Sequence, residues 1–292
     1  MVNSISFFIK TYICITKLNT KMIDYNLYDK ELNNWIDNEK IAANLLNLTG
    51  QLMYDKGIEI VLFRQNILDV GVTELMRLVA YAENVVERKI DLKTALALTQ
   101  VISDLELPPS KLDLGLLTAE YLEEKPENHK TFIKEKLKEI IDSKISFSPR
   151  DIVLFGFGRI GRLAARELIR QAGKGQQMRL KAIVVRNITD EQIIKRANLL
   201  RNDSVHGSFK GLVELDIDKR IIIVNGQIIH LIDGSNPETI DYEKYGIKNA
   251  LLIDNTGAFK SKEALSCHLK AKGIKKVLLT APGTEIPNIV YG

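Results

Sequence analysis

Hydrophobic residues in the first half of the chain recur at intervals of three, four and seven positions, the spacing of one helix face. Four such stripes are formed by Leu75, Leu78, Val79, Ala82, Val85 and Val86; by Leu98, Val101, Ile102 and Leu105; by Ile133, Leu137, Ile140 and Ile141; and by Leu32, Ile36, Ala43 and Leu46 around Trp35. We therefore predict an all-helical domain over residues 22–144, with these stripes in its core.

From Asp151 the pattern changes to short apolar runs that alternate with helical segments. Strands are predicted at 152–155, 181–185, 212–215, 221–224, 228–232, 251–254 and 276–280, and helices at 163–169, 190–200 and 262–271. This alternation predicts an α/β domain over residues 151–292, with a mostly parallel sheet and right-handed crossovers. Asn225-Gly226 predicts a hairpin turn, and therefore an antiparallel insertion. Residues 145–150 are expected to be a linker.

The sharpest motif is the run Gly156-Phe157-Gly158-Arg159-Ile160-Gly161, which ends a predicted strand and begins a predicted helix. The first glycine permits a tight turn, the second lets a pyrophosphate approach the backbone, and the third lets helix and strand pack closely. The N–H groups of Arg159 and Ile160 would then face the phosphates at the positive end of the helix dipole. The motif predicts a Rossmann-like dinucleotide-binding domain.

The end of the second strand bears on the choice of cofactor. An acidic residue there normally binds the ribose 2′-hydroxyl, but this strand ends in Val185-Arg186-Asn187. Asn187 can bond a hydroxyl without repelling a 2′-phosphate. Arg186 either attracts such a phosphate or is a solvated charge at the strand end. NAD and NADP therefore both remain open as the cofactor.

Composition excludes several classes of protein and site. The 292 residues are 45% apolar and 27% charged, which suits one large or two ordinary globular domains. Two cysteines exclude a disulfide framework, and four histidines leave little room for a histidine metal site, so we expect no metal. No apolar run approaches the length of a membrane span, and no membrane partner is expected.

Charge is distributed unevenly along the chain. Residues 1–149 hold 18 Lys and Arg against 22 Asp and Glu, whereas residues 150–292 hold 23 against 15. The basic second part suits an anionic ligand. It would also suit a nucleic acid, but no nucleic-acid-binding signature accompanies the charge. We therefore expect a phosphate-bearing small ligand and no nucleic acid.

Four segments of the second half resemble the glyceraldehyde-3-phosphate dehydrogenase family, in the family's order and with about its spacing. They are Phe155–Arg162, Asp203–Gly211, Asn255–Phe259 and Thr280–Gly283. The resemblance covers residues 151–292. The helical region before them resembles the N-terminal extension of a long bacterial form of the family.

The resemblance implies a set of cofactor-binding residues and a reaction. Asn187 stands at the ribose position, Ser235 falls near a cofactor-contacting position, Thr256, Gly257 and Phe259 line the adenine and ribose pocket, and Thr280 lies near the nicotinamide half. The implied reaction is the phosphorylating oxidation of an aldehyde, with hydride transfer to NAD or NADP, in glycolysis or gluconeogenesis. A cytoplasmic enzyme that is tetrameric once its catalytic domain is present is implied as well.

No catalytic residue is expected within this chain. The family's nucleophile lies in a Ser-Cys-Thr-Thr-Asn motif, and the sequence has none. Cys267 lies in a predicted helix, where His268 would point about 100° away, so a Cys-His pair is not expected. Cys14 is a worse candidate, and His206 is interpreted as a structural, hydrogen-bonding residue. We expect the chain alone to be inactive.

Two interpretations of this pattern remain. The first is the NAD(P)-binding portion of a dehydrogenase, truncated before the catalytic cysteine, with an incomplete domain over 151–292. The second is a non-enzymatic, stand-alone dinucleotide-binding protein. Residues 1–21 are interpreted as a non-native or disordered leader, because Met22 opens a polar stretch that resembles an ordinary start; the alternative is a weakly membrane-associated segment.

Overall fold

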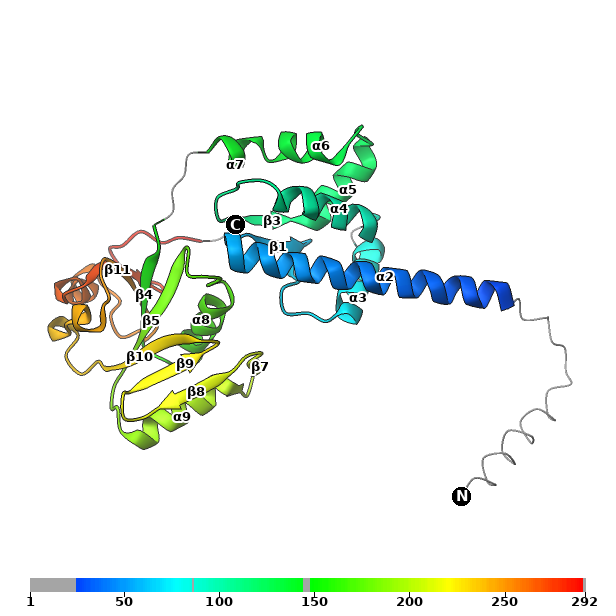
Figure 1. The fold of residues 1–292 in the computed structure, drawn as a ribbon. Helices are drawn as coiled ribbons and strands as arrows, with labels where there is room; N and C mark the ends of the chain where they lie inside the picture. The colour runs from blue at the N-terminus through cyan, green and yellow to red at the C-terminus, as the bar shows by residue number, and fades with distance from the viewer. Residues whose placement is uncertain (1–24, 86, 144–147, 291–292) are drawn as a thin grey trace, which may run out of the picture.

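The computed structural model describes residues 25–85, 87–143 and 148–290 (Figure 1). The predicted leader 1–21, with Cys14, lies outside these residues, as does Val86. The helical domain begins with α2 (Tyr25–Gln51) and the π-helical turn η1 (Leu52–Lys56). Its other helices are α3 (Val72–Val85), α4 (Leu92–Ser103), α5 (Leu114–Glu124), α6 (His129–Lys136) and α7 (Lys138–Asp142).

Three of the four predicted stripes supply the core of this domain. Leu75, Leu98, Ile102 and Ile133 are fully buried there. The side chains of Asp91, Asp113 and Asn128 cap α4, α5 and α6 by accepting backbone N–H bonds. None of the described helices is long and apolar enough to cross a membrane.

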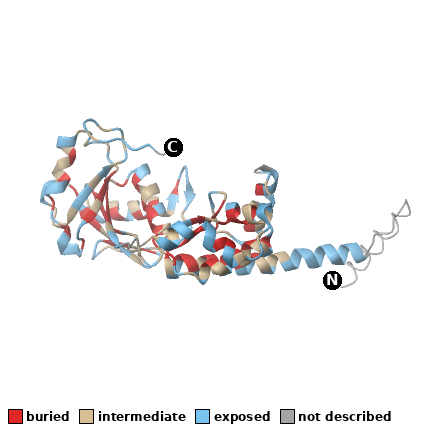
Figure 2. Ribbon diagram, turned by 90° about the horizontal axis from the view of Figure 1, so that it is seen from above, coloured by how far each residue is buried: buried red, intermediate tan, exposed pale blue. Residues whose placement is uncertain are grey.

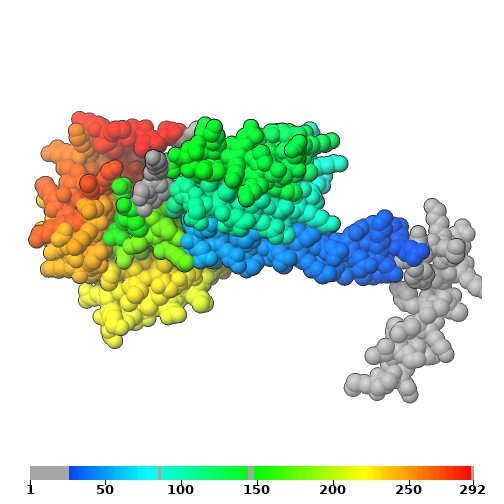
Figure 3. All heavy atoms as spheres, turned by 45° about the horizontal axis from the view of Figure 1, so that its top comes forward, coloured from blue at the N-terminus to red at the C-terminus, as the bar shows by residue number. Residues whose placement is uncertain are grey.

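Most of the fourth stripe is not in the core, so that prediction was wrong except for Leu46, which is partly buried against the core. Trp35 is 48% exposed, Leu32 is 43% exposed, and the first half of α2 projects from the rest of the protein (Figures 2 and 3). The buried face of α2 is instead formed by Ala42, Leu45 and Thr49 in its second half. Helical spacing identifies a face, but only the packing partner decides whether that face is covered.

The helical domain also contains a small sheet that the sequence analysis missed. Strand β1 (Glu59–Leu62) pairs antiparallel with β2 (Gln65–Asn66) and parallel with β3 (Lys111–Asp113). Every residue of β1 is buried, so the strand lacks the polar alternation that marks a half-exposed strand. The other two strands are too short to give a pattern.

The second domain is built on one twisted sheet, and the Rossmann-like prediction is confirmed. Its strands are β4 (Arg150–Phe155), β5 (Met178–Val185), β8 (Val213–Asp216), β9 (Ile221–Val224), β10 (Gln227–Asp233), β11 (Ala250–Asp254) and β12 (Ile274–Leu279). They lie in the order β12-β11-β4-β5-β10-β9-β8. The first five in this order are parallel, and β9 and β8 form the predicted antiparallel insertion. Asn225 and Gly226 both have positive φ angles, 48° and 79°, as the predicted turn requires.

Alternate residues of the central strands face two separate cores. On one face, Ile152 and Leu154 pack with Ala165 and Ile193 of the helices α8 (Arg159–Arg170) and α9 (Asp190–Arg201). On the other face, Val153 packs with Tyr242 of η3 (Tyr242–Tyr245) and with Ala271. Other short elements of the domain are η2 (Pro237–Thr239), α10 (Lys262–Ser266) and η4 (Cys267–Lys270). A short ribbon of β6 (Asn202–Asp203) and β7 (Gly207–Ser208) follows α9.

Candidate functional site

The glycine loop joins β4 to α8, and its three glycines are required for different reasons. Gly156 has a φ of +92°, and a Cβ there would lie 2.7 Å from Thr256 Cγ2. A Cβ on Gly161 would overlap the carbonyl oxygen of Gly156. A Cβ on Gly158 would meet no other described atom within 4 Å. Packing therefore requires the first and third glycines, whereas the second borders open space.

The first turn of α8 is free to bind an anion. Its N-cap residue is Gly158, which has no side chain with which to cap the helix. The first N–H groups of a helix have no partner within the helix, and they carry the positive end of its dipole. The backbone at Arg159 and Ile160 thus forms an anion cradle beside the open space at Gly158, and both residues are exposed. This cradle fits a phosphate group.

Two adjoining cavities open at the carboxyl ends of the strands. The first, of about 420 Å³, is lined by Gly156, Phe157, Gly158, Val185, Arg186, Arg196, Thr256 and Ala258. The second, of about 330 Å³, is lined by Phe155, Arg186, Asn187, Gly234, Ser235, Pro237 and Phe259. Arg186 lines both. The structure therefore brings together most of the residues that the sequence analysis selected, from four strand ends.

A larger hollow, of about 890 Å³, lies elsewhere, along β12 and the segment that follows it. Thr280 lines that hollow and neither of the two cavities near the glycine loop. Gly257, with a φ of +66°, falls between Thr256 and Ala258 of the first cavity. Its conformation turns the chain after β11.

Asp254, at the end of β11, ties two of the selected threonines together. It is fully buried, and its Oδ1 accepts hydrogen bonds from Thr256 N at 2.8 Å and Thr256 Oγ1 at 2.7 Å. Its backbone oxygen accepts from Thr280 N at 3.0 Å and Thr280 Oγ1 at 3.1 Å. Its Oδ2 lies 2.9 Å from His268 Nε2, and that ring contacts Phe155 and Phe259. This buried pair supports the strand ends that line the cavities.

Arg196 is a cavity residue that the sequence analysis missed. It lies on α9, and its Nη2 donates to the carbonyl of Arg186 at 3.1 Å. Its Nε is buried without a hydrogen-bond partner among the described residues. Burial lowers the pKa of the Arg196 guanidinium by desolvating its charge, and no described acid lines the cavity to offset this effect. The one signal in the sequence that points to Arg196 is its position in the helix that directly follows Asn187.

The Asp203–Gly211 segment is fixed to α8 by an ion pair. Arg162 Nη2 lies 2.6 Å from Asp203 Oδ2, and both side chains are largely buried. The hydrogen bonds from Arg162 hold the pKa of Asp203 well below its ordinary value. The backbone N–H of His206 donates to Asp203 at 3.1 Å, and His206 itself is exposed. The hydrogen bond that fixes His206 therefore comes from its backbone N–H group.

The side chains of Cys267 and His268 have different surroundings. His268 is engaged with Asp254, and Cys267 does not line either cavity near the glycine loop. Burial raises the pKa of the Cys267 thiol, and the nearby carboxylates of Glu238 and Asp254 raise it further. This environment disfavours a thiolate. Among the described residues, no group of three or more His, Cys, Asp and Glu side chains is placed to hold a metal ion.

Comparison with known proteins bears directly on this site. Residues 150–262 match the family model described as the NAD binding domain of glyceraldehyde 3-phosphate dehydrogenase. The chain is 37% identical over 254 residues to a glyceraldehyde-3-phosphate dehydrogenase-like protein of Pseudomonas aeruginosa, a match that spans 85% of this chain and 55% of that relative. Because 254 residues exceed the α/β domain, that similarity extends into the helical domain.

Two shorter matches have about the length of the α/β domain. The glyceraldehyde-3-phosphate dehydrogenase of Lactococcus lactis is 36% identical over 137 residues, which is 47% of this chain and 37% of the relative. That of Clostridium pasteurianum is 32% identical over 141 residues, or 48% of this chain and 38% of the relative. The chain thus spans about half, or less, of the length of these relatives.

Proposed function

We propose that this chain, a member of the glyceraldehyde-3-phosphate dehydrogenase family whose residues 150–262 match the family's NAD binding domain, binds a nicotinamide dinucleotide for the phosphorylating oxidation of an aldehyde. The observation that carries the proposal is the uncapped start of α8 at Gly158, which opens onto a cavity lined by strand ends. The substrate proposed is glyceraldehyde 3-phosphate, as in the relatives named.

Each part of the site has a proposed role in holding the dinucleotide. The N–H groups at the start of α8, near Arg159 and Ile160, bind the pyrophosphate. Asn187 bonds the adenosine ribose, and Ser235 lies beside it in the second cavity. Thr256, Gly257 and Phe259 line the adenine side, and Thr280 lies toward the nicotinamide half. Bound there, the dinucleotide would accept the hydride that leaves the aldehyde carbon.

The reaction also needs a cysteine thiolate to attack the aldehyde carbon, and we propose that Cys267 does not supply it. The thiol is partly buried beside carboxylates, and its raised pKa keeps it protonated at neutral pH. The one histidine next to it is held by Asp254. This chain therefore contributes dinucleotide binding to the reaction, and the described residues do not contribute the nucleophile.

We further propose that the site accepts NADP as well as NAD. The lining of the first cavity contains two arginines, Arg186 and Arg196, and no described acid. Asn187 replaces the carboxylate that would repel a 2′-phosphate. Arg196 is held by its Nη2 to the strand end, so its guanidinium needs little reordering to meet a phosphate.

Calorimetric titration tests the proposed function. We expect NAD and NADP each to bind the purified chain at a ratio of one per chain, because the chain has one glycine loop. ADP-ribose should compete with both, since it shares the pyrophosphate and the adenosine. Adenosine, which lacks the pyrophosphate, serves as the matched control and is expected to bind at least about 100-fold more weakly. Failure of both dinucleotides to bind would reject the proposal.

Two variants are both expected to shift the preference of the site toward NAD. Arg196→Gln should raise the Kd for NADP at least about tenfold, the value of one charge-assisted hydrogen bond, and change the Kd for NAD less than about threefold. Asn187→Asp should shift preference toward NAD by about 1–2 kcal/mol. Lys195→Gln, which removes an exposed charge from the same helix, is the control. Equal losses for NAD and NADP in Arg196→Gln would assign that residue to the pyrophosphate instead.

A further inference from the structure

A carboxylate of the helical domain is buried against the α/β domain. Glu59 begins β1, and its side chain is only 10% exposed. Its Oε1 accepts hydrogen bonds from Asn66 Nδ2 at 2.7 Å and from Arg170 Nη1 at 2.9 Å. Lys111 Nζ lies 3.5 Å from Oε2. A buried charge without a partner is costly, and the nearer of the two cations beside Glu59, Arg170, belongs to the other domain.

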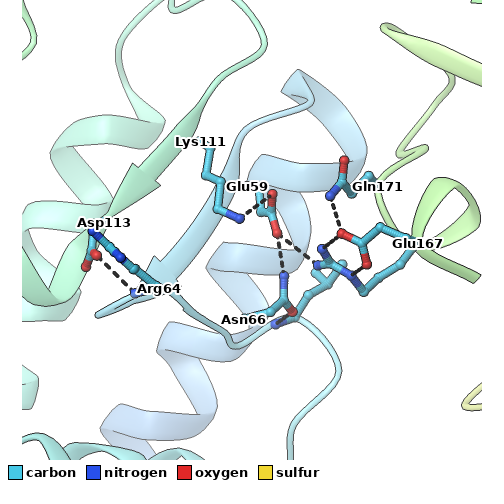
Figure 4. A network of polar contacts seen from close by, with 9 residues as sticks. Glu59, Arg64, Asn66, Lys111, Asp113, Glu167 and Gln171 are labelled. Carbon is cyan, nitrogen blue, oxygen red and sulfur yellow. Dashed lines mark hydrogen bonds and ion pairs between the residues drawn. The ribbon is translucent and has the colours of Figure 1, made fainter. Parts of the chain in front are cut away.

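Arg170 is the last residue of α8, and it binds two carboxylates at once. Its Nη2 and Nε donate to Glu167 at 2.6 and 3.0 Å, while its Nη1 donates to Glu59. Gln171 also donates to Glu167 (Figure 4). These bonds lower the pKa of Glu167 and raise that of Arg170, so this pair is charged at neutral pH. The fork of one arginine thus joins β1 to the end of α8.

The turn that follows α8 continues the same interface. Lys174 Nζ lies 2.8 Å from Asp55 Oδ1, and Gln176 Nε2 approaches the carbonyls of Tyr54 and Asp55 at 3.4 and 3.5 Å. Gly173 lies so close to η1 that a Cβ there would be 2.8 Å from the Met53 carbonyl oxygen. The helical domain therefore holds both the end of α8 and the turn leading to β5.

These contacts lie at the opposite end of α8 from the glycine loop. One further polar contact between the domains, from Lys210 Nζ to the Asp69 carbonyl at 3.5 Å, lies outside this cluster. No described residue of the helical domain lines either cavity at the strand ends. A helix of 12 residues is about 18 Å long, so the helical domain is remote from the bound phosphates but fixed to the same rigid element.

We propose that the helical domain is a brace for the dinucleotide-binding helix, in which Glu59 and Arg170 act as positioning residues. The proposal rests on the proposed function, because it concerns the affinity of that site. The brace fixes the C-terminal end of α8 and the turn after it, and thereby fixes the direction in which the first turn presents its N–H groups. By linkage, a ligand bound at the first turn must stabilise the docked helical domain by the same free energy.

The test compares dinucleotide affinity in variants of the full chain. Glu59→Gln keeps the shape of the side chain but removes the charge that Arg170 binds. We expect it to raise the Kd for NAD and for ADP-ribose at least about fivefold, the lower end of ordinary coupling between sites. Arg170→Gln should have a similar effect, and the double variant should lose no more than either single one, because both act through the same contact.

Glu120→Gln is the matched control. Glu120 is a partly buried carboxylate of the helical domain that pairs with Lys136 at 2.9 Å, within that domain. It should leave the Kd unchanged. If Glu59→Gln does not fold, Arg170→Lys replaces it, since lysine keeps a cation opposite Glu59 but loses the fork that also binds Glu167.

A purely structural role predicts a different result from the brace. It would lower the unfolding temperature and leave the Kd unchanged in the folded variant, and that outcome would overturn the proposal. If the helical domain acts as a brace, the variant should show both a higher Kd and faster hydrogen exchange at the amides of the first turn of α8. Binding by the parent chain tests the proposed function separately: a parent that binds and a Glu59→Gln variant that binds equally well would reject the brace alone.

Discussion

Replacing Gly158 by valine is expected to abolish dinucleotide binding in a chain that remains folded. Gly158 has a φ of −76°, which valine can adopt, and a Cβ there would meet no other described atom within 4 Å. The added side chain would therefore enter the space that the pyrophosphate needs. We expect a loss of at least about 100-fold in affinity for NAD and NADP, because the charge-assisted bonds at the start of α8 are lost together. Calorimetry measures the loss, and circular dichroism verifies the fold.

Gly161→Val provides the contrasting control from the same loop. A Cβ at Gly161 would overlap the Gly156 carbonyl oxygen, and the residue is buried between helix and strand. Here the expected damage is to stability, by about 1–3 kcal/mol or more, as in other overpacked sites. If Gly158→Val bound dinucleotide as tightly as the parent, the phosphate site would not be at this loop.

Removing the ring of His268 is expected to destabilise the α/β domain by about 3–5 kcal/mol, because it empties a packed site and leaves a buried carboxyl without a hydrogen-bond partner. His268→Ala leaves Asp254 fully buried without its partner at Oδ2, and it removes a ring that packs on Phe155 and Phe259. Because Asp254 also holds Thr256, dinucleotide affinity should fall in the variant. Urea denaturation and calorimetry measure the two effects.

The exposed His206 supplies the control for this prediction. His206→Ala should change the free energy of unfolding by less than about 0.5 kcal/mol, as is usual for an exposed side chain. A cost below about 1 kcal/mol for His268→Ala would show that the Asp254–His268 pair does not support the strand ends. In that case the stability of β11 would not depend on the pair of residues that holds Thr256 in place.

The parts of the site that were predicted from the sequence are those whose signals are local. The glycine loop could be identified from the sequence because the turn, the phosphate approach and the helix packing each require a glycine within six consecutive residues, Gly156–Gly161. Asn187 and Thr256 could be placed because each closely follows a recognisable strand, and parallel strands bring their carboxyl ends to one edge of the sheet.

The parts that were missed depend on contacts between distant residues. Arg196 enters the cavity from a helix, and nothing in its neighbours along the chain distinguishes it from the solvated arginines. Asp254 and His268 are 14 positions apart and become partners only when η4 packs on the sheet. Glu59 and Arg170 are separated by 111 positions and belong to different domains. From sequence alone, a charged residue is predicted to be exposed unless the residue that pairs with it is known.

The exposed position of Trp35 on α2 decides how this protein can be observed. It is the single tryptophan of the chain, and it lies about half exposed in the helical domain, whereas both cavities belong to the α/β domain. Its fluorescence therefore reports on the solvent around the projecting half of α2, and a change in emission signals that this helix has been covered. Dinucleotide binding has to be followed by heat, by exchange or by the ligand's own absorbance.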